Sequence, residues 1–237
     1  MHRMTRRELK EDELLTTFEW FQRFGKEHYR ELFGMIAAGI LIVGSVMGWK
    51  DYTARQEAAA NMALATALST YHAYVGAPAP GSGVTESYAT VEERDKKALA
   101  QFRDVASRYR RQKAGQIALY HVGVCQSDLG DSAVAIKTLQ QAARSSDNDI
   151  ASLAQFARAG ELIKTGQQAE GLKLYQQLAD HPTLAVPRAT ALLAMADAQR
   201  ATQPAEARKI YAQLQVEFAS DATLASTLKE QIASLPQ

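Results

Sequence analysis

The sequence has few of the residues that cross-linked, metal-binding or disordered proteins need. One cysteine in 237 residues excludes a disulfide scaffold and any zinc site built on paired cysteines. Six prolines and fourteen glycines are too few for a disordered or collagen-like chain. With 27 basic and 26 acidic side chains, the chain lacks the basic surplus that a nucleic-acid binder uses to displace counterions. These classes are excluded.

Alanine is what the sequence has in abundance. Roughly one residue in six is alanine, the strongest helix former, whereas the strand-favouring residues valine and isoleucine are sparse. The composition therefore predicts an all-α protein.

The clearest apolar segment is residues 32–49, LFGMIAAGILIVGSVMGW, which has no charged side chain. Its 18 residues reach the lower end of a membrane-spanning helix. Tyr29, Phe33 and Trp49 lie near its ends, where aromatic rings favour the lipid interface. We expect a single transmembrane anchor here. The alternatives are a buried core helix, which in so polar a chain usually keeps one wet face, and a cleaved signal peptide.

Basic residues flank this segment unequally: seven precede it, whereas only Lys50 and Arg55 follow it before residue 80. The positive-inside rule predicts a cytoplasmic tail at 1–31 and places the rest of the chain in the periplasm, across a bacterial inner membrane. Leu14, Phe18 and Phe21 stand at helical spacing in the tail. It can lie on the inner leaflet, dock on a membrane partner, or form a solvated lead-in.

Beyond the anchor, residues 50–75 keep a helical pattern and are expected to form a stalk or the first helix of a repeat domain. Residues 76–91 begin with GAPAPGSGVTES, whose glycine, proline and serine content predicts a loop. The last segment, residues 92–237, alternates helical periods with short breaks.

A period of 36 residues organises this last segment. Breaks at Gly130-Asp131, Gly166-Gln167 and Thr202-Gln203 each precede a short helix, in which a small residue, a bulky one and a further apolar one follow at successive turns. The three sets are Ala135, Leu139 and Ala142; Gly171, Tyr175 and Leu178; and Ala207, Tyr211 and Leu214. Paired antiparallel helices pack in this way. The pattern predicts an α-solenoid of tetratricopeptide type, closed by a C-terminal capping helix.

No cluster of residues indicates catalysis or metal binding. His121 and Cys125 lie one helical turn apart, but two ligands do not make a structural zinc site, so Cys125 is expected to be a small buried apolar side chain. Asp147, Asn148 and Asp149 lack the glycine and glutamate of a calcium loop, so Asn148 or Asp149 is expected to cap a helix. We expect no enzyme, cofactor, metal or small-molecule substrate.

Three side chains on the first helices of the repeat pairs are candidates for partner binding: Tyr120, Phe156 and Arg158. First helices line the concave side of stacked pairs, and aromatic residues and arginine dominate the binding energy at protein interfaces. The alternative for Tyr120 and Phe156 is ordinary core packing. Arg158 is the better probe, because a charge is hard to bury without a partner.

The segment Gly48-Trp49-x-x-Tyr52-x-x-x-Gln56, the alanine-rich helix that follows it and the C-terminal repeat segment together resemble the YfgM-type proteins, which are ancillary subunits of the bacterial Sec translocon. The resemblance implies a periplasmic repeat domain that associates with the SecYEG channel and the membrane-anchored chaperone PpiD, near emerging secretory proteins. The longer cytoplasmic tail and the linker at 76–87 depart from that family's pattern. A scaffold of another envelope complex, in cell division, outer-membrane assembly or secretion, is the alternative function.

Overall fold

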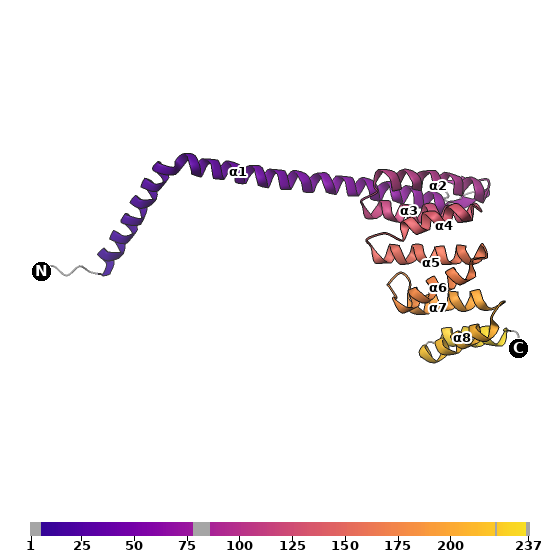
Figure 1. Cartoon of the computed structure of the whole chain (residues 1–237). Helices are drawn as coiled ribbons and strands as arrows, with labels where there is room; N and C mark the ends of the chain where they lie inside the picture. The colour runs from indigo at the N-terminus through magenta and orange to yellow at the C-terminus, as the bar shows by residue number, and fades with distance from the viewer. Residues whose placement is uncertain (1–5, 78–85, 221, 236–237) are drawn as a thin grey trace. The chain divides into compact units, whose positions relative to one another are not determined.

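The computed structural model describes the backbone of residues 6–77, 86–220 and 222–235, and their side chains except those of 6–29, 32, 35, 36, 222 and 224. Helices account for most of this part of the chain, as expected of an all-α protein (Figure 1). In chain order the elements are α1 (Arg6–Tyr71), β1 (Tyr74–Val75), β2 (Ser87–Tyr88), α2 (Val91–Arg108), α3 (Lys113–Asp128), α4 (Ser132–Ala142), α5 (Asn148–Lys164), α6 (Gln168–Asp180), α7 (Arg188–Gln199), α8 (Pro204–Glu217) and α9 (Ala222–Ala233). The chain divides into two compact units, Met1–Gln56 and Glu57–Gln237.

The first unit contains the N-terminal part of α1. Every described side chain from Arg30 to Arg55 is exposed. Among the residues that the structure describes, no helix is long and apolar enough to cross a bilayer. The side chains of most of the predicted tail, 1–31, and three of those in the predicted anchor, 32–49, lie outside the described residues.

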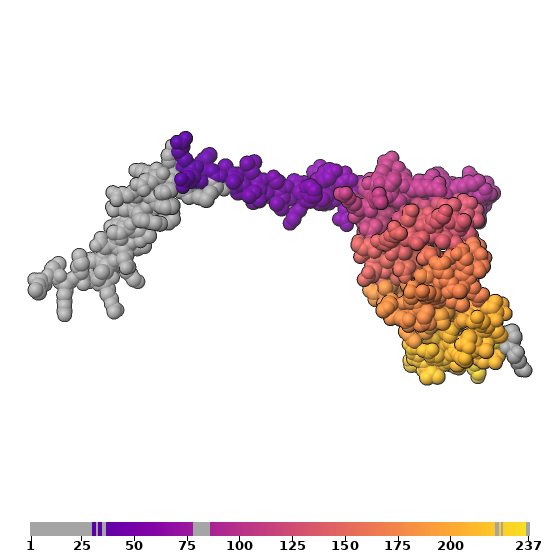
Figure 2. All heavy atoms as spheres, viewed as in Figure 1, coloured from indigo at the N-terminus to yellow at the C-terminus, as the bar shows by residue number. Residues whose placement is uncertain are grey.

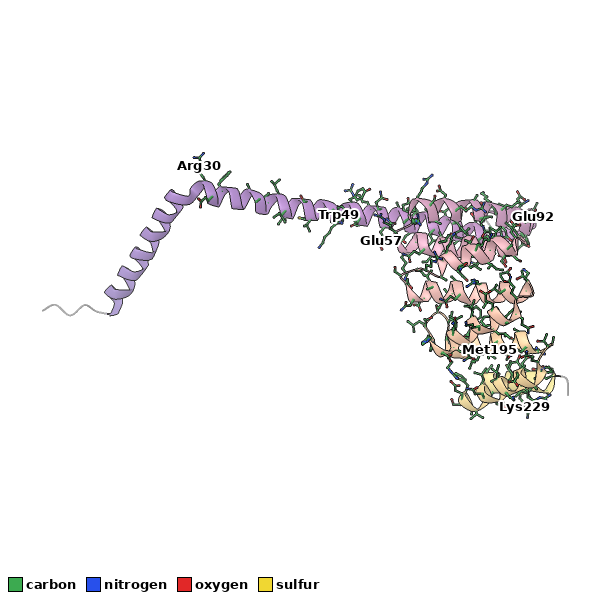
Figure 3. The ribbon with its side chains drawn as sticks, in the orientation of Figure 1. Arg30, Trp49, Glu57, Glu92, Met195 and Lys229 are labelled. Atoms are coloured by element: carbon green, nitrogen blue, oxygen red, sulfur yellow. The ribbon has the colours of Figure 1, made fainter. Side chains whose placement is uncertain are left out.

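The second unit stacks its helices in pairs along the chain. Helix α3 packs with α4, α5 with α6 and α7 with α8, while α9 packs on α8 at the C-terminal end (Figure 1). In the space-filling view the pairs border one another in chain order (Figure 2). Glu57 is the first residue of this unit, Glu92 lies in the first turn of α2 and Lys229 lies on α9 (Figure 3).

Two of the three predicted breaks end helices through glycine. Gly130 and Gly166 both have φ of 86°, a left-handed conformation that costs glycine little. At the first break, the N–H of Asp131 donates to the carbonyl of Gln126 at 2.8 Å and that of Gly130 donates to Ser127 at 3.0 Å. The second break repeats this pattern, which is a Schellman motif. The third break, Thr202-Gln203, contains no glycine, and neither of its residues has a positive φ.

The register predicted for the second helix of each pair is confirmed. The small positions are all buried, and the bulky residues Leu139, Tyr175 and Tyr211 are at most 6% exposed. Gly171 shows why one position must be small: a Cβ there would lie 2.7 Å from the carbonyl oxygen of Ala159 and 2.5 Å from the side chain of Ile163. This glycine lets α6 approach the backbone of α5.

The first layer of the second unit is built around the C-terminal end of α1. Ala60, Leu64 and Ala67 are buried in one cluster with residues of α2 and α3. The helix ends at Tyr71, four residues before the end of the predicted stalk, because Tyr74–Val75 leaves the helix to pair in parallel with Ser87–Tyr88. The centre of the predicted loop, residues 78–85, lies outside the described residues.

Helix starts follow from local chemistry, and one of them corrects an expectation. Pro204 opens α8, where its missing N–H costs nothing. The cap of α5 is Asp147 rather than Asn148 or Asp149: its carboxylate accepts from the N–H groups of Asp149 at 3.0 Å and Ile150 at 3.3 Å. The correction follows from geometry, because a capping side chain must precede the first helical residue in order to reach the free N–H groups.

Candidate functional site

Tyr120 lies on α3 and is half-buried. Its ring meets the edge of the His121 ring, with 5.0 Å between the centroids. Burial, followed by the nearby carboxylate of Asp128, raises the pKa of the Tyr120 hydroxyl above its ordinary value. Tyr120 therefore presents only part of its ring to a partner.

Phe156 holds the equivalent position on α5, one period later, and is also half-buried. Its ring centroid lies 5.1 Å from that of Tyr175, which is a buried residue of α6. The contact joins the two helices of one pair. Ordinary packing, the alternative considered for this residue, therefore accounts for much of its surface.

Arg158 has a partner within the chain. Its guanidinium donates to the carboxylate of Glu170 on α6, and its side chain is only 16% exposed. Its Nε is buried and has no hydrogen-bond partner among the described residues. The ion pair joins α5 to α6, so the charge that sequence analysis assigned to a partner protein is engaged inside one helix pair.

The three candidates do not converge on one contact. Within the described residues, no ring contact or hydrogen bond joins Tyr120, Phe156 and Arg158 to one another. What they share is the register of successive first helices.

The repeat seen in the fold also stands out in comparison with known proteins. A family model described as tetratricopeptide repeat matches residues 117–148 and 190–220, which fall on the pairs α3–α4 and α7–α8. The chain carries tetratricopeptide repeats. The pair α5–α6 lies between the two matches at the same period of 36 residues. No curated protein and no solved structure matches the chain.

Polar side chains link one tetratricopeptide pair to the next, a feature that sequence analysis missed. Ser127 donates to Glu161 at 2.5 Å, Gln168 to Thr202 at 2.7 Å, and Arg200 to Ser234 at 3.0 Å. Each link joins residues 34 positions apart. That constant offset between a hydroxyl residue and a longer polar or charged residue near the turns was the signal available in the sequence.

Glu161 shows how such a link is stabilised. Its carboxyl is mostly buried, and burial alone would raise its pKa. Hydrogen bonds from Ser127 and Ser132, together with the charge of Lys164, outweigh burial and hold the pKa below its ordinary value. The carboxylate is thus kept charged at the contact between two tetratricopeptide pairs.

The first layer of the unit holds an aromatic cluster with a half-buried histidine, His121. The His121 ring stacks on Phe102, with 4.8 Å between centroids and an interplanar angle of 13°. Tyr71 donates from its hydroxyl to Asp128 at 2.8 Å. Cys125 is fully buried, as expected, and burial raises the pKa of its thiol to about 12. A thiol in that state is a poor nucleophile.

These side chains do not make a metal centre. Among the described residues, no group of three or more histidine, cysteine or carboxylate side chains can hold a metal ion. Tetratricopeptide repeats are generally non-catalytic and mediate contacts between proteins. The repeats therefore suggest a protein–protein interaction scaffold.

Proposed function

We propose that the chain is a non-catalytic interaction scaffold anchored in a bacterial inner membrane through residues 32–49. The observation that carries this proposal is the exposure of large apolar side chains along one stretch of α1. They are Phe33 at 74%, Ile40 at 66%, Leu41 at 70%, Ile42 at 64%, Val43 at 58%, Val46 at 50%, Met47 at 65%, Trp49 at 70% and Tyr52 at 62%. Covering such a side chain contributes roughly 1.5–3 kcal/mol, so leaving nine of them in water costs about 14–27 kcal/mol. A bilayer removes that cost.

The proposed topology places the tail at 1–31 in the cytoplasm. It places the second unit, Glu57–Gln237, which we call the tetratricopeptide unit, in the periplasm. It rests on the seven basic residues before the apolar segment against the two that follow it closely. Protease added to spheroplasts should digest the chain after Trp49 and spare the first 31 residues. Protection of the C-terminal unit in intact spheroplasts would contradict this topology.

The proposed partners are a SecYEG-type translocon and a periplasmic chaperone of the PpiD type, near emerging secretory proteins. The support is the order of the elements, in which an apolar segment, an alanine-rich helix and a tetratricopeptide unit follow one another along the chain. A scaffold for another envelope complex remains the alternative, because tetratricopeptide repeats serve many assemblies.

Site-specific photocrosslinking distinguishes the two. A photoreactive phenylalanine analogue at Tyr52, which is 62% exposed, should crosslink to translocon subunits in intact membranes. The same analogue at Tyr211, which is fully buried, provides the matched control and should give no crosslink to another protein. Crosslinks from Tyr52 only to subunits of a division, outer-membrane assembly or secretion complex would favour the alternative.

A further inference from the structure

Two grooves of similar size lie at equivalent places in successive helix pairs, with volumes of about 720 and 690 Å³. The first is bordered by Gln116 and Leu119 of α3, Gln141 of α4, and Arg144, Ser145 and Ser146 after α4. The second is bordered, 36 positions later, by Ser152, Gln155, Gln177, Asp180, His181 and Pro182. We name them groove 1 and groove 2. The repeat has thus produced the same hollow twice.

The two grooves differ in charge. Arg144 of groove 1 corresponds to Asp180 in groove 2, so a cation has been exchanged for an anion at the same place in the repeat. Groove 1 has a second arginine, Arg110, from the turn after α2. Both arginines are exposed. Groove 1 is therefore a cationic site within a chain of nearly balanced charge.

Among the residues that the structure describes, no acidic side chain neutralises these two cations. In the part of the chain that the structure describes, neither Arg110 nor Arg144 has a carboxylate within ion-pair distance. Asp147 follows the groove directly but is engaged elsewhere: it pairs with Lys113 at 2.7 Å and caps α5. Lys113 holds the pKa of the Asp147 carboxyl below its ordinary range. Both guanidinium groups are therefore without an acidic partner in the described ranges and can bind an external anion.

The rest of groove 1 suits a peptide. The carbonyl oxygen of the Gln116 amide accepts from the Ser145 hydroxyl, and Ser145 in turn accepts from the N–H of Asp147 at 3.0 Å. This holds Gln116 in place and leaves its NH₂ group without a partner among the described residues. Gln141 is exposed and offers both an amide donor and an acceptor. Leu119 supplies apolar surface beside these groups.

We propose that groove 1 binds an acidic peptide segment of a partner protein. Two carboxylates of the segment pair with Arg110 and Arg144, whose planar donors match carboxylate oxygens, and its main chain bonds to Gln116 and Gln141. Phosphate groups need only donors, so an amide acceptor and an apolar wall favour a peptide over a lipid headgroup. The inference depends on the proposed function only in treating the chain as an interaction scaffold, and it does not require a membrane or a translocon.

The test uses the full chain in mild detergent and a fluorescent peptide of alternating aspartate, glutamate and glycine, followed by anisotropy. The wild-type chain should bind this peptide and bind its asparagine–glutamine counterpart at least about tenfold more weakly, as expected when charge-assisted hydrogen bonds are lost. Arg144→Asp, which installs the residue found in groove 2, should weaken binding about tenfold or more. Its circular dichroism spectrum and Tm should stay unchanged, because the residue is exposed.

Lys137→Asp is the matched control. Lys137 is exposed on α4, does not border groove 1, and gives the same change in net charge. It should alter binding by less than about twofold at physiological salt, where distant surface charges are screened. Equal weakening by both variants, or equal binding of the neutral peptide, would overturn the proposal. So would displacement of the peptide from the wild-type chain by inorganic phosphate, or by phosphatidylglycerol in the same detergent, at concentrations where sodium chloride of equal ionic strength has no effect, because groove 1 would then be a phosphate site.

Discussion

Helix α1 differs on the two sides of the boundary between the units. From Arg30 to Arg55 all of its described side chains are exposed, whereas after Glu57 a residue is buried every third or fourth position: Ala60, Leu64 and Ala67. One continuous ladder of backbone hydrogen bonds holds both parts. The comparison therefore separates helix formation, which is local, from burial, which requires neighbours.

The sizes of the side chains sharpen this contrast. The exposed part presents isoleucine, leucine and tryptophan, while the packed part buries mainly alanine. Small residues let helices α1, α2 and α3 approach closely, and close packing then supplies the stabilising contacts. Large apolar side chains with nothing against them need an environment from outside the chain. The two parts of one helix are thus suited to different surroundings.

The largest difference between the two regions should come from removing a leucine. Leu139 is fully buried, so Leu139→Ala should lower the free energy of unfolding of the tetratricopeptide unit by about 3 kcal/mol, through lost burial and a residual cavity. Leu41→Ala in the exposed part should change it by less than about 0.5 kcal/mol. Urea unfolding of the full chain in detergent, followed by circular dichroism, measures both. A similar loss in the two variants would show that Leu41 is packed within the chain.

A glycine-to-alanine change should have opposite signs in the two regions. Gly171→Ala forces a Cβ against the backbone of Ala159 and should destabilise the unit by about 2 kcal/mol. Gly44→Ala meets nothing within 4 Å and should increase the helicity of α1, because alanine is favoured over glycine by roughly 0.5–1 kcal/mol in a helix. Melting curves and helical circular dichroism report each change. Stabilisation by Gly171→Ala would mean that α5 and α6 are further apart than described.

Gly171 also shows how much of the fold could be predicted from the sequence. The period of 36 predicted that Gly171 occupies a small, buried position, because a repeat compares each residue with its equivalents. The same reasoning located the helix ends at Gly130 and Gly166 and the buried side of each second helix. Residues 71–91 lie outside the repeats and have no equivalent residues with which to compare them. The parallel pairing of β1 with β2 was therefore not predicted.

The candidate site was less predictable than the fold. Residue type and register singled out Arg158, but no local pattern pairs it with Glu170, twelve residues away on the neighbouring helix. The same holds for groove 1, whose lining comes from α2, α3, α4 and the turns after α2 and α4. Its charge differs from that of groove 2 because Arg110 and Arg144 border groove 1, whereas Asp180 borders groove 2. The repeat period predicts which helix faces are buried against one another. It does not predict which side chains of different helices and turns come together at a surface site.

Acid should weaken the tetratricopeptide unit through His121. Burial, and then the nearby His72, lower the pKa of His121 to about 4, against about 6.5 in an unfolded chain. The unfolded chain therefore binds the extra proton between these values, so stability is fully present above pH 6.5 and is lost as the pH falls toward 4. The loss at pH 5 should be about 1–2 kcal/mol. His121→Leu should remove this slope, whereas His181→Leu, at an exposed position, should keep it. Urea unfolding at several pH values measures the slope, and an unchanged slope in His121→Leu would contradict the assignment.

The smallest difference concerns one ion pair from each region. Arg158 and Glu170 join α5 to α6 with the arginine 16% exposed, whereas Arg55 and Asp51 lie 4.0 Å apart on α1 with exposures of 85% and 80%. Arg158→Glu should lower the free energy of unfolding by about 1 kcal/mol, because it places like charges together beside a partly buried contact. Arg55→Glu should cost no more than a few tenths of a kcal/mol in so exposed a place.

The reversed pair, Arg158→Glu with Glu170→Arg, distinguishes a structural role for Arg158 from a binding role. If the pair mainly joins the two helices, the double variant should recover most of the lost stability, and a double-mutant cycle in urea should give a coupling energy of about 0.5–1 kcal/mol. We also expect Arg158→Glu to weaken capture of translocon or chaperone partners from detergent extracts. If the pair is mainly structural, the double variant should restore this capture, because the surface offered to a partner is restored along with the fold. Should stability recover while capture stays lost, the guanidinium of Arg158 itself contacts the partner. The half-buried rings of Tyr120 and Phe156 would then again be candidates for the same binding surface.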